Sequence, residues 1–227
     1  MSLARWFRFS PLLLSCLLAA CTSTRSRPAG MMAEVITEPA GIEVSFRGKT
    51  LGPAPLHLEI DNLAEASSFS AAQSEPPVVE RRVRVLSLHQ VQVLIRVGGE
   101  PSPLAQRLGL SRVLVFEQGE ATTFDLDRYE LKSAFTPLLA EQAKLLAGPF
   151  AKLDVYVCGH TDATGEADHN RILSLRRAEA VSSFLVAHGV ARSRLRTQGF
   201  AADYPVAGND TDEGRALNRR TEIVLPD

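Results

Sequence analysis

The sequence LDVYVCGHTDATGEADHNRILSLRRAEAVSSFLVAHG, residues 153–189, contains a strand, a turn and a helix in one uninterrupted run. Apolar residues alternate from Leu153 to Cys158, which predicts a half-buried strand. The turn of residues 159–165 follows this strand. We then expect a helix from about Glu166 to His188, with Gly189 as its C-terminal cap. A strand followed by a long helix is typical of mixed α/β folds.

One face of this expected helix carries an arginine among apolar side chains. With Leu173 at zero and about 100° per residue, Arg177 lies at about 40° on the helix. Phe184 at about 20° and Val181 at about 80° flank it. Asn170, at about 60°, lies on the same side. A guanidinium on the buried face needs a partner, because an unpaired buried charge costs several kcal/mol.

Asp162, in the turn before the helix, is the candidate partner of Arg177. Two interpretations are open. In the first, the two side chains form a structural ion pair that closes the turn onto the helix. In the second, one anion and one cation lie a few ångströms apart and complement a zwitterionic ligand that carries both an amine and a carboxylate.

The sequence around this unit predicts a C-terminal domain of residues 110–227. Its expected strands, besides the one described above, are Val113–Phe116, Thr122–Leu126, Leu195–Phe200 and Arg220–Leu225. A helix is expected from Ser133 or Thr136 to Gly148, and a short one from Glu213 to Leu217. The order predicts an α/β fold, a β-α-β-α-β-β sandwich with its helices packed on one sheet.

Residues 35–105 predict a small all-β module in front of this domain. Ile42–Arg47 and Leu56–Ile60 alternate in polarity around a glycine-containing turn, Gly48–Gly52, which predicts a hairpin. Val83–Ile95 predicts one long strand or two short ones.

The N-terminus has the features of a signal peptide. Arg5 and Arg8 precede the apolar run of residues 11–18, which is too short to span a bilayer as a helix. We expect residues 1–20 to be this signal and residues 21–34 to be a flexible tether, rich in Ser, Thr, Arg and Pro at its start.

Leu18-Ala-Ala-Cys21 resembles the bacterial lipobox, in which the cysteine is acylated and becomes the first residue of the mature chain. The resemblance implies lipidation at Cys21, and attachment through several acyl chains is a stable anchor. Thr22 at the next position is similar to the pattern of lipoproteins sorted to the outer membrane. The alternative is an ordinary secretory signal in which Cys21 lies near the cleavage site by chance.

Composition excludes several classes of protein. The 227 residues are 45% hydrophobic and 22% charged, which is typical of a globular chain and excludes disorder as its main state. Lys and Arg number 25 against 26 Asp and Glu, a net charge of -1 that argues against a nucleic-acid binder. The three cysteines, Cys16, Cys21 and Cys158, indicate no disulfide framework.

Motifs across the C-terminal hundred residues resemble one known family. They are Gly159-His-Thr-Asp162, Asn170, Leu173-Ser174, Arg177-Ala178, Gly199-Phe200, Pro205, Asn209, Gly214-Arg215 and Asn218-Arg219-Arg220-Thr-Glu222. From about Thr122 to Leu225 the chain resembles the OmpA-like peptidoglycan-binding family. Gly41 to Leu56, in the middle module, weakly resembles the PEGA family of envelope β modules through its turn glycines and prolines.

The resemblance to the OmpA-like family implies a ligand and its site. Asp162 would bind the free ammonium of meso-diaminopimelate in the cell-wall stem peptide, and Arg177 its carboxylate. Asn170 and the backbone near Thr161 would assist, whereas we interpret Arg219 and its neighbour Arg220 as mainly structural. The chain would then be an outer-membrane lipoprotein, facing the periplasm, that binds peptidoglycan without covalent attachment and tethers the membrane to the wall.

The sequence also suggests two other functions. His160, Asp162, Asp168 and His169 lie within ten residues and suggest a metalloenzyme, but adjacent positions on a helix point about 100° apart and converge poorly on one ion. We therefore expect no catalysis, no metal and no cofactor. A closer alternative is a wall-anchoring subunit of a secretion system or motor, in which the β module binds an envelope protein partner.

Overall fold

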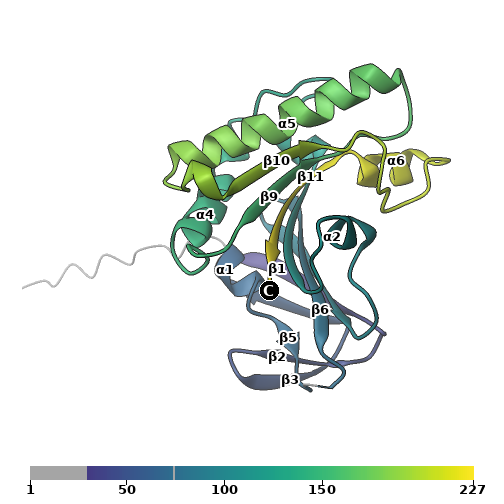
Figure 1. The fold of residues 1–227 in the computed structure, drawn as a ribbon. Coiled ribbons are helices and arrows are strands. Elements are labelled where there is room, and N and C mark those ends of the chain that lie inside the picture. The colour runs from purple at the N-terminus through teal and green to yellow at the C-terminus, as the bar shows by residue number, and fades with distance from the viewer. Residues whose placement is uncertain (1–29, 74) are drawn as a thin grey trace, which may run out of the picture.

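The computed structural model describes residues 30–73 and 75–227 and contains a large mixed sheet of eight strands (Figure 1). The predicted signal peptide and Cys21 lie outside these residues. The strands, in spatial order, are β10 (Leu195–Gly199), β9 (Val155–Gly159), β11 (Arg220–Pro226), β8 (Val113–Gly119), β6 (Val78–Ser87), β7 (Gln90–Val97), β1 (Met31–Glu38) and β4 (Leu56–Ile60). A smaller sheet contains β3 (Lys49–Pro53), β2 (Glu43–Phe46) and β5 (Ser70–Ala71).

Helices cover both faces of the large sheet (Figure 1). Two of them, α4 (Thr136–Ala147) and α5 (Ala167–Ala187), pack on one face, and α2 (Pro103–Arg107) packs on the other. The short helices are α1 (Leu63–Ala66), α3 (Glu120–Thr123), η1 (Arg192–Arg194) and α6 (Asp212–Asn218). None of the helices in the described part of the chain has the length and hydropathy that a membrane span requires.

The α/β class and most predicted elements of the C-terminal half are confirmed. The long helix, the helix that begins at Thr136 and the last two strands lie within a few residues of their expected bounds. The strand expected at Thr122–Leu126 is wrong, because this segment contains helix α3 instead. The hydroxyls of Thr122 and Thr123 both donate to the Gly119 carbonyl, at 2.8 and 2.9 Å, and close a helical turn directly after β8.

The predicted hairpin of the middle module is also wrong. Strand β2 pairs with β3, and Arg47 and Gly48 form the two-residue turn between them. Both residues have positive φ, 52° and 74°, as a type I′ turn requires. Strand β4 pairs with β1 in the large sheet instead. Val83–Ile95 belongs to two strands, β6 and β7, as one of its two interpretations predicted.

The β module expected at residues 35–105 and the domain expected at residues 110–227 both contribute strands to the large sheet. Strand β6, from the expected β module, pairs in parallel with β8 of the expected C-terminal domain. Residues 31–34, expected in the tether, form the start of β1 instead.

A buried ion cluster joins β6 to β8 and β11. Arg82 pairs with Glu80 at 2.8 Å, with Glu222 at 3.1 Å and with Glu117, and all four side chains are at most 5% exposed. Burial alone would lower the pKa of Arg82, but the three carboxylates raise it well above its ordinary value. Burial would raise the pKa of Glu222, but Arg82 and Arg220 hold it well below its ordinary value. Arg82 therefore ties β6 to Glu117 on β8 and to Glu222 on β11.

Replacing Arg82 with Met should lower the free energy of unfolding by about 3 to 5 kcal/mol, because it leaves buried carboxylates without their shared cation. Arg196→Met is the matched control. Arg196 is half-exposed and lies 3.8 Å from Asp154, so its loss should cost less than about 1 kcal/mol. Urea denaturation of both variants measures the difference, and equal losses would contradict a structural role for the cluster.

Candidate functional site

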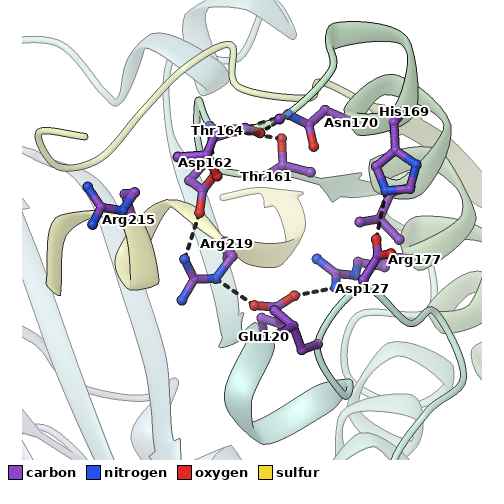
Figure 2. Close-up of a pocket in the computed structure, with 13 residues that line it drawn as sticks. Glu120, Asp127, Thr161, Asp162, Thr164, His169, Asn170, Arg177, Arg215 and Arg219 are labelled. Carbon is purple, nitrogen blue, oxygen red and sulfur yellow. Dashed lines mark hydrogen bonds and ion pairs between the residues drawn. The ribbon is translucent and has the colours of Figure 1, made fainter. Parts of the chain in front are cut away.

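A pocket of about 320 Å³ lies at the edge of the large sheet where β8 and β9 end and β11 begins (Figure 2). All four residues predicted to bind ligand, Thr161, Asp162, Asn170 and Arg177, line it. Parallel strands β8 and β9 carry their following loops to the same edge, which is why residues far apart in sequence meet here.

Close packing of α5 on the strand ends positions the site. A Cβ atom at Gly159 would lie 2.0 Å from the Ser174 carbonyl oxygen, and one at Gly199 would lie 2.4 Å from the Leu175 amide nitrogen. Only glycine allows the helix to approach this closely. The loop after β9 is also tied to α5, because Asn170 Nδ2 donates to the Thr164 carbonyl at 2.7 Å.

Arg177 is buried, as its place on the helix predicted, with an exposed fraction of 1%. Its Nε donates to the Arg128 carbonyl at 2.9 Å, and its Nη2 pairs with Oε1 of Glu120. The guanidinium also lies 5.2 Å from the centre of the Phe124 ring. The neighbouring Arg176 is exposed and lies over Tyr129 instead.

Asp162 accepts hydrogen bonds through both carboxylate oxygens. Its Oδ1 accepts from the Thr164 amide at 2.9 Å and from the Thr164 hydroxyl, and its Oδ2 accepts from Arg219 Nη1 at 2.6 Å. Burial alone would raise the pKa of Asp162, but the hydrogen bonds from Thr164 and Arg219 outweigh it and lower the pKa below its ordinary value. The carboxylate is therefore charged at neutral pH.

Glu120 and Arg219 lie between Asp162 and Arg177, so the direct ion pair between those two residues, the first of the two interpretations, is wrong (Figure 2). Oε2 of Glu120 accepts from Arg219 Nε at 2.6 Å, which completes a chain of four alternating charges. Arg219, interpreted as mainly structural, lines the pocket as well. Glu120 was missed, although an acidic residue directly after a strand that ends at this edge is a usable signal.

The two histidines considered as metal ligands contact different groups. His169 Nε2 lies 2.6 Å from Asp127 Oδ1 at the pocket, whereas His160 is buried, stacks on Phe200 and contacts the Asp203 carbonyl at 3.3 Å. Within residues 30–73 and 75–227, no group of three or more His, Cys, Asp or Glu side chains is placed to hold a metal ion.

Comparison with known proteins identifies the domain that contains this pocket. Residues 123–219 match the OmpA family. The matched stretch, 97 of the 227 residues, is an OmpA-family domain. Most of the residues that line the pocket lie within the matched range, but Glu120 precedes it.

Three curated relatives are similar to part of this chain. "Probable lipoprotein YiaD" of Escherichia coli is 42% identical over 112 residues, 49% of this chain and 51% of the relative. "Outer membrane protein Omp38" of Acinetobacter baumannii is 42% identical over 128 residues, 56% of this chain and 35% of the relative. "Peptidoglycan-binding protein ArfA" of Mycobacterium tuberculosis is 48% identical over 82 residues, 36% of this chain and 24% of the relative. The chain thus spans about half or less of the length of these relatives.

The burial of His160 gives the OmpA-family domain a distinctive pH dependence. Burial and the nearby Arg220 guanidinium lower the pKa of His160 from 6.5 to about 3. In the unfolded chain the His160 side chain is protonated below about pH 6.5, whereas in the folded chain it stays neutral down to about pH 3. The free energy of unfolding should therefore fall as the pH is lowered from about 6.5, with a slope approaching 1.4 kcal/mol per pH unit from this residue.

Urea denaturation at several pH values between 7 and 5 measures this slope, and His160→Asn should flatten it. This range lies above the ordinary pKa of carboxyl groups, so the depressed pKa of Glu222 contributes little there. An unchanged slope in the variant would rule out His160 as its source.

Proposed function

We propose that this protein is an outer-membrane lipoprotein that binds the diaminopimelate-containing stem peptide of peptidoglycan and tethers the outer membrane to the cell wall. The observation that carries the proposal is the pocket, in which Asp162 and Arg177 present one buried anion and one buried cation at the same edge of the sheet. The free end of diaminopimelate carries an ammonium and a carboxylate on one carbon, so its charges complement this pair.

The pocket also supplies neutral polar groups for such a ligand. Thr161 and Asn170 line it, and both are at most 9% exposed. Hydrogen bonds to charged groups contribute about 1.5 to 3 kcal/mol each before ordering costs. A single site should therefore bind weakly, and attachment to the wall would depend on many neighbouring stem peptides and on a second anchor in the membrane.

Relatives support the location and the ligand of the proposal. The names of the three relatives include a lipoprotein, an outer membrane protein and a peptidoglycan-binding protein. Residues 123–219 match the OmpA family and contribute most of the pocket, so we assign wall binding to that domain. We propose binding without catalysis, and a protein partner for the β module stays a prediction.

Wall binding is tested by sedimentation with diaminopimelate-type peptidoglycan, using the chain from Thr22 to Asp227. Asp162→Asn and Arg177→Gln should each lower the apparent affinity about tenfold, because each removes one charged contact. Arg176→Gln is the matched control, since it removes an adjacent arginine that is exposed and outside the pocket. Equal pelleting of all variants would refute the site, and no pelleting of the parent would refute the function.

Membrane anchoring is tested separately with the full chain expressed in a Gram-negative host. Cys21→Ser should abolish the incorporation of radiolabelled palmitate into the protein, because the thiol that would carry the acyl chains is gone. Ser23→Ala keeps Cys21 and should still incorporate the label. A Cys21→Ser protein that still incorporates palmitate would contradict lipid attachment at this residue.

A further inference from the structure

We infer that Glu120 and Arg219 form an internal ion pair that occupies the places of the ligand's carboxylate and ammonium, so that ligand binds by displacing this pair. The inference rests on the proposed function, because it concerns the same pocket. It makes Glu120 and Arg219 determinants of affinity, and it predicts a site that is held weak by residues of its own chain.

The contacts of the four charged groups carry the argument. Glu120 pairs with Nη2 of Arg177, the group proposed to bind the ligand's carboxylate. Arg219 pairs with Oδ2 of Asp162, the group proposed to bind the ligand's ammonium, at 2.6 Å. Arg177 therefore already binds a carboxylate, and Asp162 already binds a cation. These are the same charges that the ligand's carboxylate and ammonium would bring to them.

Glu120 and Arg219 also pair with each other, through Oε2 and Nε at 2.6 Å. Together they present one anion and one cation at a fixed separation, as a zwitterion does (Figure 2). The anion faces Arg177 and the cation faces Asp162, which is the order in which the proposed ligand's charges would face them.

A second cavity adjoins the pair and gives displaced side chains a place to go. It has a volume of about 160 Å³, and both Glu120 and Arg219 line it as well as the ligand pocket. Its other walls include Arg84 and Leu217. The Arg219 side chain is 29% exposed, so it can turn toward this cavity without unpacking the core.

Glu120 lies just outside the stretch that matches the OmpA family. Glu120 precedes residues 123–219, which match the OmpA family, and it is held by helix α3 directly after β8. Arg219 is the last residue of the matched range. The internal pair therefore joins a residue of the family domain to one contributed from outside the match.

Two roles of Glu120 predict opposite effects of its charge on ligand affinity. If Glu120 serves to hold Arg177 in place for the ligand, then removing its charge weakens binding. If Glu120 competes with the ligand, removing its charge strengthens binding. Glu120→Gln keeps the shape of the side chain and removes only the charge, so the sign of its effect distinguishes the two roles.

The experiment is calorimetric titration of the chain from Thr22 to Asp227 with the tripeptide L-alanyl-γ-D-glutamyl-meso-diaminopimelate. Glu120→Gln should bind it at least about threefold more tightly than the parent, and Arg219→Gln should do the same. Glu141→Gln is the control, because it removes one carboxylate from α4, away from the pocket, and its affinity should match that of the parent. Circular dichroism confirms that each variant is folded.

Each outcome decides the inference. A parent that binds while both variants bind equally or more weakly overturns the inference and leaves the proposed function standing. A parent and variants that all fail to bind overturn both. If Glu120→Gln does not fold, Arg219→Gln decides alone, because it leaves Glu120 paired with the buried Arg177.

Discussion

The burial of the Arg177 guanidinium is the constraint on which the rest of the site depends. Helix α5 carries Arg177 on its inner face, and a buried cation without a partner costs several kcal/mol. Glu120 and the Arg128 carbonyl meet this need from the segments that follow β8. The second oxygen of Glu120 then binds Arg219, whose other nitrogen reaches Asp162. One buried charge thus ties together α5, the end of β8, the start of β11 and the loop after β9.

A second set of buried charges connects the OmpA-family domain to the middle of the chain. Arg82 on β6 binds carboxylates on β8 and β11, so the strands of the expected β module continue the sheet of the OmpA-family domain. A separate spacer would not need such contacts. The buried cluster predicts that residues 31–97 stabilise the domain that carries the pocket.

Local features of the sequence were predicted well, and long-range pairings were not. Helical periodicity placed Arg177 and Asn170 on the buried face because neighbours on a helix are set by spacing alone. The partner of Arg177 lies 57 residues away, which no local pattern reports. The predicted hairpin was wrong for the same reason, because β4 pairs with the distant strand β1 and not with the strand predicted before it in sequence. At Thr122 and Thr123, hydroxyl contacts with the Gly119 carbonyl outweighed the preference of β-branched residues for strands.

The central claim is that the pocket recognises a zwitterion and needs both of its charges. The most direct measurement compares the chain's affinity for two tripeptides, L-alanyl-γ-D-glutamyl-meso-diaminopimelate and L-alanyl-γ-D-glutamyl-L-lysine, which differ by one carboxylate at the free end. Amide chemical shifts followed by NMR should change at Thr161, Asp162 and Thr164 with the first peptide, at an affinity about tenfold higher than with the second. Equal affinities, or shift changes confined to other residues, would contradict the account.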